Sequence, residues 1–118
     1  MNASIIEEDM TTEYIVVLIT VPSKDVANKI SDLLLEKKLA ACANIVSSIN
    51  SLYTWQGKMN NDEESLMIVK TRADLFESEF IDAVKSVHPY DVPEIIALPI
   101  IMGSKSYLDW IGEETKQE

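Results

Sequence analysis

Short apolar runs alternate along the chain with segments in which apolar residues recur at helical spacing. The runs are rich in β-branched residues and too short for buried helices, so they predict strands. Strands are expected at residues 14–21, 41–55, 65–71 and 94–101. The polar stretch 58–64, together with Gly57, is expected to form the turn between the second and third strands.

Three segments show the periodicity of amphipathic helices. The first follows Ser23, a residue type favoured at the N-cap, and ends near residues 37–38, two lysines that suit the C-terminal end of a helix dipole. The second covers residues 74–87 and ends before Pro89, because a residue that precedes proline disfavours helical geometry. A short third helix is expected to begin at Ser104.

The order strand, helix, strand, strand, helix, strand predicts an α+β fold, a ferredoxin-like βαββαβ sandwich with a short C-terminal helix. Strands one and three should lie in the centre of the sheet, and both long helices should cover one face. The fourth strand should lie at an edge, where Pro99 is tolerated because it lacks a donor. We expect residues 14–118 to form this single domain and residues 1–13 to form an acidic, disordered tail.

Both faces of the predicted sheet are apolar. Residues 15–19, 66–69 and 95–98 are apolar at every position, whereas a strand with one solvated face alternates apolar and polar residues. The two long helices can cover only one face, and the other would be a larger apolar patch than monomers normally expose. Self-association through closed symmetry is therefore predicted, without a choice between two and three copies.

The net charge of the chain limits the kinds of partner that it is expected to bind. Ten Lys and Arg residues stand against twenty Asp and Glu residues, so the net charge is −10. This balance argues against binding to nucleic acid or to an anionic membrane surface. It weakly favours cations, although a solvated acidic surface that keeps the protein soluble is the better explanation. Cys42 is the single cysteine, which fits a reducing, cytoplasmic compartment.

Five short motifs carry a resemblance to a known family. They are residues 39–45 (LAACANI), 53–57 (YTWQG), 69–71 (VKT), 88–94 (HPYDVPE) and 107–110 (YLDW). In this order they resemble the CutA-like divalent-cation-tolerance proteins over residues 14–112. The resemblance implies a ferredoxin-like homotrimer with an architecture similar to the PII signalling proteins, and tolerance of copper and other divalent metals. It implies no catalytic apparatus, so we do not expect an enzyme.

The candidate metal ligands are Cys42, His88, Glu64 and Glu94. A thiolate and an imidazole are favoured ligands for copper, but one of each cannot fill a tetrahedral zinc site. The symmetry of a trimer or the two carboxylates would have to complete the shell. The alternatives are that Cys42 is a small buried hydrophobe and that His88 closes the preceding helix through local hydrogen bonds.

A second group of residues suits a small ligand in a cleft between subunits. It consists of Trp55, Lys70, Tyr90 and Trp110. Two carboxylates join the group, Glu94 from the 88–94 motif and Glu64 from the end of the polar stretch 58–64. The alternative is that Trp55 and Trp110 anchor a subunit interface, where such aromatics are enriched.

These observations leave three functional hypotheses. The first is a cytoplasmic homotrimer that binds a divalent metal, copper above all, and contributes to the response to metal ions. The second is a PII-like sensor or adaptor with a ligand in a cleft between subunits. The third is a stable trimeric scaffold with incidental metal binding. An enzyme finds no support, because the three glycines are scattered and form no phosphate-binding loop.

Overall fold

The computed structural model describes residues 12–117 of the chain. Its four strands are β1 (Tyr14–Val21), β2 (Cys42–Trp55), β3 (Lys58–Arg72) and β4 (Ile95–Pro99). Its α-helices are α2 (Lys24–Glu36), α3 (Ile81–Val87) and α4 (Lys105–Glu114). A 3-10 turn, η1 (Ala73–Leu75), and a π-helical turn, η2 (Phe76–Phe80), precede α3. The predicted order of strands and helices is confirmed.

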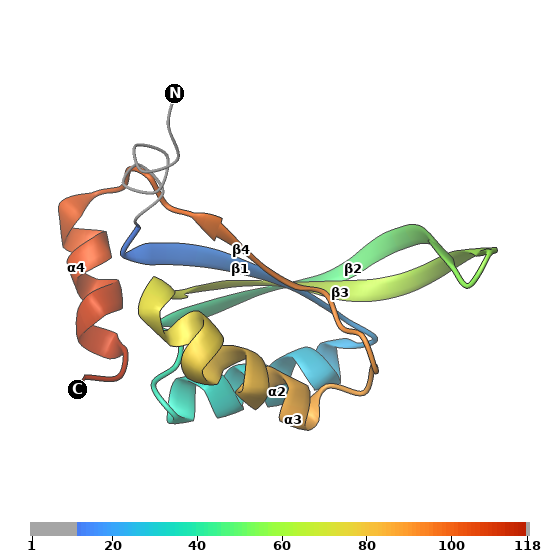
Figure 1. Cartoon of the computed structure of the whole chain (residues 1–118), viewed down its shortest axis with the longest axis horizontal. Coiled ribbons are helices and arrows are strands. Elements are labelled where there is room, and N and C mark those ends of the chain that lie inside the picture. The colour runs from blue at the N-terminus through green and yellow to red at the C-terminus, as the bar shows by residue number, and fades with distance from the viewer. Residues whose placement is uncertain (1–11, 118) are drawn as a thin grey trace.

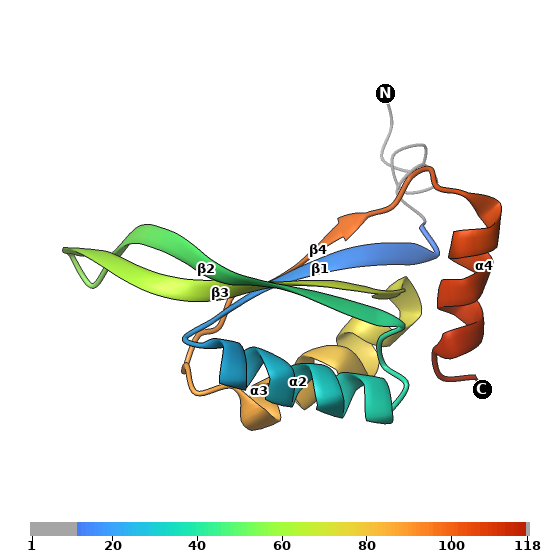
Figure 2. The ribbon, with the colours of Figure 1, turned by 180° about the vertical axis from the view of Figure 1, so that it is seen from behind.

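The four strands form one antiparallel sheet in the order β2-β3-β1-β4, and α2 and α3 lie together on one side of it (Figures 1 and 2). This is the predicted ferredoxin-like arrangement, with strands one and three in the centre. Pro99 lies on the edge strand β4, opposite Ile15 of β1, as expected for a residue without a backbone donor. Ser23 caps α2, accepting a hydrogen bond from the Val26 N–H at 3.3 Å.

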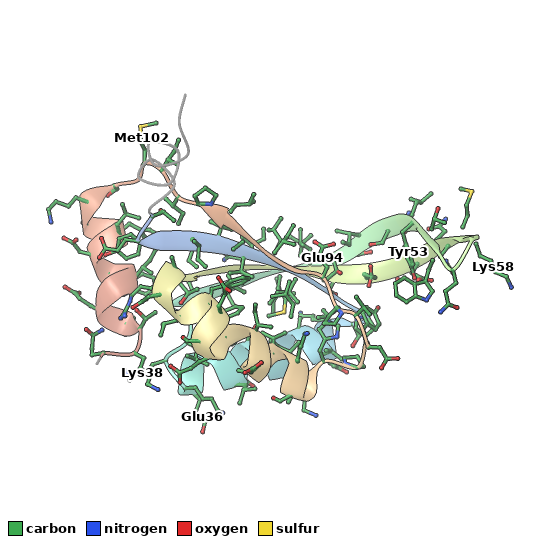
Figure 3. All side chains as sticks on the ribbon, in the orientation of Figure 1. Glu36, Lys38, Tyr53, Lys58, Glu94 and Met102 are labelled. Atoms are coloured by element: carbon green, nitrogen blue, oxygen red, sulfur yellow. The ribbon has the colours of Figure 1, made fainter. Side chains whose placement is uncertain are left out.

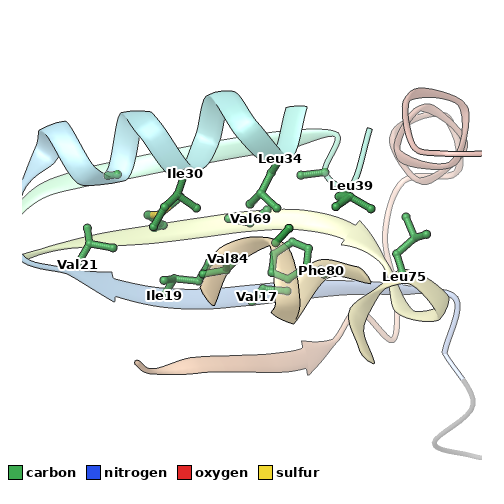
Figure 4. Close-up of a cluster of buried hydrophobic side chains, with 14 of the residues drawn as sticks. Val17, Ile19, Val21, Ile30, Leu34, Leu39, Val69, Leu75, Phe80 and Val84 are labelled. Carbon is green, nitrogen blue, oxygen red and sulfur yellow. The ribbon is translucent and has the colours of Figure 1, made fainter. Parts of the chain in front are cut away.

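The hydrophobic core lies between the sheet and the two helices. Every second residue of β1 is buried there, because successive side chains of a strand point to opposite faces. These strand residues pack against the inner sides of α2, η2 and α3 (Figure 4). The core includes Ile15, Val17, Ile19, Val21, Ala27, Ile30, Leu34, Met67, Val69, Phe80 and Val84.

The other side of the sheet is apolar as well, and we call it the open face. It carries the alternate residues of the same strands, which are half-buried or exposed. Its apolar side chains include Val16, Leu18, Val46, Leu66, Ile68, Ile96 and Leu98. Cys42, Asn44 and Lys70 lie on the same face at its β2 edge. Within residues 12–117, neither α2 nor α3 covers this side (Figures 1 and 2).

Strands β2 and β3 continue past the sheet as a long projecting hairpin (Figure 1). The prediction of a turn over residues 58–64 is wrong, since β3 begins at Lys58 and the turn is only Gln56 and Gly57. Both turn residues have positive φ angles, 52° and 80°, as a tight two-residue hairpin turn requires. The polar stretch lacked an apolar signal because both of its faces project beyond the core.

Two further predictions need correction. The segment 74–87 is not one α-helix, because the 3-10 and π turns occupy residues 73–80 and only Ile81–Val87 is α-helical. Apolar periodicity does not distinguish these helix types. The fourth strand is also shorter than predicted, since β4 covers only Ile95–Pro99.

Residues 1–11 of the expected tail lie outside the described residues. Glu13, at the end of that expected tail, is described, and its carbonyl accepts a hydrogen bond from the Ala73 N–H. None of the helices in the described part is long and apolar enough to span a membrane.

Candidate functional site

A hollow of about 750 Å³ lies where the hairpin leaves the sheet, beside the loop that joins α3 to β4. We call it the acidic hollow. Glu94 and Tyr53, labelled in Figure 3, lie on this side of the molecule, at the end away from α4. Its lining residues are Thr20, Asn50, Ser51, Leu52, Tyr53, Trp55, Glu64, Pro89, Tyr90, Asp91, Val92 and Glu94.

His88 holds the loop over the hollow in place. Its Nε2 lies 2.9 Å from the carbonyl oxygen of Thr20, and its Nδ1 lies 3.1 Å from the Tyr90 backbone nitrogen. A carbonyl only accepts and an N–H only donates, so the ring is a neutral imidazole with its proton on Nε2. Both nitrogens are therefore engaged, and metal binding by His88 would require one of these bonds to break.

Glu64 and Tyr90 form the central polar contact of the hollow. The Tyr90 hydroxyl donates a hydrogen bond of 2.7 Å to Oε2 of Glu64, whose residue surface is only 7% exposed. Burial raises the pKa of Tyr90, and the bond to the Glu64 carboxylate raises it further. Tyr90 is thus held as a neutral donor toward the buried carboxylate.

The hollow combines aromatic rings with acidic groups. Tyr53, Trp55 and Tyr90 supply the rings, and Glu64, Asp91 and Glu94 supply the carboxylates. No lysine, arginine or histidine stands among its lining residues within 12–117. Such a surface attracts a cation and repels an anion.

Tyr53 and Asp91 line this hollow but were missed in the sequence, and so was Asp62, which binds Tyr53 from outside the lining. Tyr53 donates a hydrogen bond to the Asp62 carboxylate across the hairpin, and this bond raises the pKa of Tyr53. The available signal was the spacing of Ser51, Tyr53 and Trp55, since alternate residues of a strand share a face. Asp62 has no such signal, because the polar stretch 58–64 predicts a turn.

Cys42 and Lys70 lie elsewhere, directly opposite each other on β2 and β3. Lys70 donates a hydrogen bond to the Asn44 side-chain oxygen, which also lies 3.8 Å from the Cys42 sulfur. Cys42 is half-buried. Burial raises the pKa of Tyr107 in α4, and the neighbouring Cys42 adds to the shift.

The structure thus separates the predicted ligands into two places. Cys42 is level with Val16 in the sheet, whereas His88 contacts Thr20, four residues or about 13 Å further along β1. Trp110 lies in α4 and does not line the hollow. The centroid of its ring is 5.5 Å from that of Tyr107.

Glu64, Glu94, Trp55 and Tyr90 do come together in the acidic hollow. Within one copy, residues 12–117 contain no group of three or more His, Cys, Asp or Glu side chains placed to hold a metal ion. A full coordination shell therefore needs groups from outside the single chain.

Comparison with known proteins identifies the relatives of the chain. The family described as CutA1 divalent ion tolerance protein matches residues 15–114. The divalent-cation tolerance protein CutA of Thermus thermophilus is 52% identical over 100 residues, which cover 85% of this chain and 96% of that protein. The chloroplastic CutA of Arabidopsis thaliana is 46% identical over 93% of this chain, and the match spans 60% of its own length.

Solved structures show the same fold. The crystal structure of CutA1 from Oryza sativa matches with a TM-score of 0.86 at 44% identity, over 92% of this chain and 98% of that chain. The CutA1 structure from Thermus thermophilus matches with a TM-score of 0.84 at 50% identity, over 87% of this chain and 99% of that chain.

Proposed function

Because the chain belongs to the CutA1 divalent-ion-tolerance family, we propose that it is a homotrimer that binds a divalent cation, with copper as the first candidate. Its role in this proposal is a contribution to metal tolerance in the cytoplasm. The family description names tolerance of divalent ions and no catalysed reaction. We accordingly assign the chain binding and no enzymatic activity.

The observation that carries the cation-binding proposal is the lining of the acidic hollow. Glu64, Asp91 and Glu94 contribute carboxylates, and the described lining residues include no basic side chain. Carboxylates are ligands for divalent cations, and an uncompensated negative field raises the local concentration of cations. Glu64 and Glu94 are the proposed ligands in this hollow.

The trimer is supported by the open face. Its apolar side chains are only partly covered within one copy, and closed assembly would remove them from water. Cys42 lies on the same face, so assembly would bring several copies of this soft ligand toward the subunit interface. We propose Cys42 as the thiolate ligand for copper, and His88 as a ligand only if its bond to Thr20 or to Tyr90 is released.

Calorimetric titration of the metal-stripped protein with Cu²⁺ tests this function. We expect saturable binding that Cys42→Ala weakens if the thiolate is a ligand, and that Glu64→Gln or Glu94→Gln weakens if the hollow is the site. His88→Ala tests the remaining ligand. Glu36→Gln, an exposed acid at the end of α2, is the matched control for lost negative charge. Copper binding that is weak and indifferent to every substitution would contradict the proposal.

A PII-like sensor or adaptor is the second candidate. The volume and aromatic walls of the acidic hollow favour it, because small-molecule sites are concave and rich in such side chains. Its acidic lining makes a phosphate-bearing ligand a poor fit. Loss of a bound metabolite or protein partner in Tyr90→Ala would support this candidate, with Lys70→Ala testing the open face. A mere scaffold would show neither specific copper binding nor a lost partner.

A further inference from the structure

Glu64 is a buried carboxylate without a counter-charge from the described residues. Tyr90 donates to Oε2, and no residue within 12–117 forms an ion pair with the carboxylate or donates to Oε1. Glu64 is more than nine-tenths buried, and what remains of its surface lines the acidic hollow. An ionised carboxylate in such a place is costly unless a positive charge accompanies it. A cation in the hollow would therefore stabilise the ionised Glu64 carboxylate.

The walls of the hollow indicate which kind of cation. Tyr53, Trp55 and Tyr90 line the hollow together with Glu64, and each of the three is partly exposed. The face of an aromatic ring attracts a cation, and it does so best for bulky, weakly hydrated cations. A bare metal ion requires several ligands at short distances, so in this hollow it needs further groups from outside the single chain. The carboxylate and the rings that one copy supplies within residues 12–117 are enough for an organic ammonium ion.

We propose that the acidic hollow binds a small organic cation through its ammonium group. Glu64 supplies the opposite charge, and Tyr53, Trp55 and Tyr90 form the aromatic wall. The hydrogen bond from Tyr90 fixes one oxygen of the carboxylate and leaves the other to face the ligand. This inference rests on one part of the proposed function, namely that the acidic hollow binds a cation.

The chain offers a direct optical test. It contains two tryptophans, Trp55 in the hollow and Trp110 in α4. In the full-length Trp110→Phe variant, Trp55 is the only tryptophan and reports on the hollow. Titration with tetramethylammonium chloride should give a saturable change in its fluorescence. Sodium chloride at equal ionic strength and tert-butanol, a neutral molecule of similar shape, should give none.

Substitutions locate the binding. Glu64→Gln in the Trp110→Phe background keeps an acceptor for Tyr90 but removes the charge, and should weaken tetramethylammonium binding by about tenfold or more. Glu36→Gln removes the same charge from the exposed end of α2 and should leave the affinity unchanged. Trp55→Leu, measured by calorimetry, should weaken it by about threefold or more.

Several outcomes overturn the inference. An equal response to sodium chloride would show ionic screening, and an equal response to tert-butanol would show an apolar pocket. An unchanged affinity in Glu64→Gln would place any binding elsewhere. Copper binding without tetramethylammonium binding would overturn this inference and leave the proposed function standing. Tetramethylammonium binding without copper binding would support this inference and contradict the proposal of copper binding.

Discussion

The two faces of the sheet are built from neighbouring residues of the same strands, yet they have opposite environments. On the covered face, Ile19 of β1 is fully buried under the helices. On the open face, Ile96 of the adjoining strand β4 is 49% exposed. The residue type is the same in both places. Burial in this domain therefore depends on what packs over a strand and not on how apolar the strand is.

Both faces carry polar groups at this end of the sheet, but these groups are satisfied in different ways. Lys70 and Asn44 bind each other there, beside the half-buried Cys42. On the covered face, the buried Thr71 hydroxyl is instead satisfied by the carbonyl of Leu39 at 2.6 Å. The covered face is thus complete within one chain, whereas the open face has the mixed apolar and polar character of a surface that meets a partner.

The largest expected effect comes from the same deletion on the two faces. Ile19→Ala should reduce the free energy of unfolding by about 2–5 kcal/mol, because it leaves a cavity in the core. Ile96→Ala should cost about 1 kcal/mol or less in the separated chain. Denaturant unfolding at several protein concentrations measures both. A concentration-dependent cost confined to Ile96→Ala would indicate that other copies cover the open face, and equal costs at all concentrations would contradict the comparison.

The next largest effect is expected from a charge placed on the open face. Ile96→Lys should lower the mass measured by sedimentation from that of the assembly to that of one chain, because an unpaired ammonium would be buried at the interface. Met59→Lys places the same charge on the hairpin at a position 85% exposed, and should leave the mass unchanged. A wild-type mass equal to one chain at micromolar concentration would remove the basis of the trimer proposal.

A smaller effect is expected at the acidic hollow. Tyr90→Phe removes the hydrogen bond to Glu64 and should cost about 1–2 kcal/mol of stability. The folded protein holds the Tyr90 proton more tightly than the unfolded chain, since the pKa is raised on folding. This contribution is therefore complete below the ordinary tyrosine pKa of about 10 and declines as pH rises toward the raised value.

Unfolding measured across alkaline pH checks the sign of this prediction. The wild-type protein should lose stability more steeply than Tyr90→Phe above the ordinary tyrosine range. Parallel slopes in the two proteins would mean that the Tyr90 hydroxyl is not held by Glu64 in solution.

The smallest effect concerns the hairpin, which extends past both faces. Gly57 has a φ of 80°, so Gly57→Ala should cost about 1 kcal/mol through strain in the turn. Gln56→Asn is the matched change, because asparagine tolerates the positive φ of this position, and it should leave stability unchanged or slightly higher. Thermal unfolding measures both, and a stabilised Gly57→Ala would show that the turn differs in solution.

Local patterns in the sequence determined the fold of the domain. β-branched runs marked the strands, and the cap at Ser23 and the stop before Pro89 marked where helices begin and end. The element order then left few arrangements for the sheet. The apolar character of both strand faces was also readable, because strand side chains alternate strictly. These are short-range properties, so they can be read without knowing which segments meet.

Sequence patterns failed where no apolar signal existed or where distant segments converge. Residues 58–64, which form the β3 side of the hairpin, are mostly polar because this part projects from the core. The site depends on which distant residues meet. Only the tertiary structure decided that Tyr90 bonds Glu64 and that Cys42 lies far from His88. Contacts of this kind arise from the packing of strands and loops far apart in the chain, and hydrophobic periodicity along one segment has no information about them.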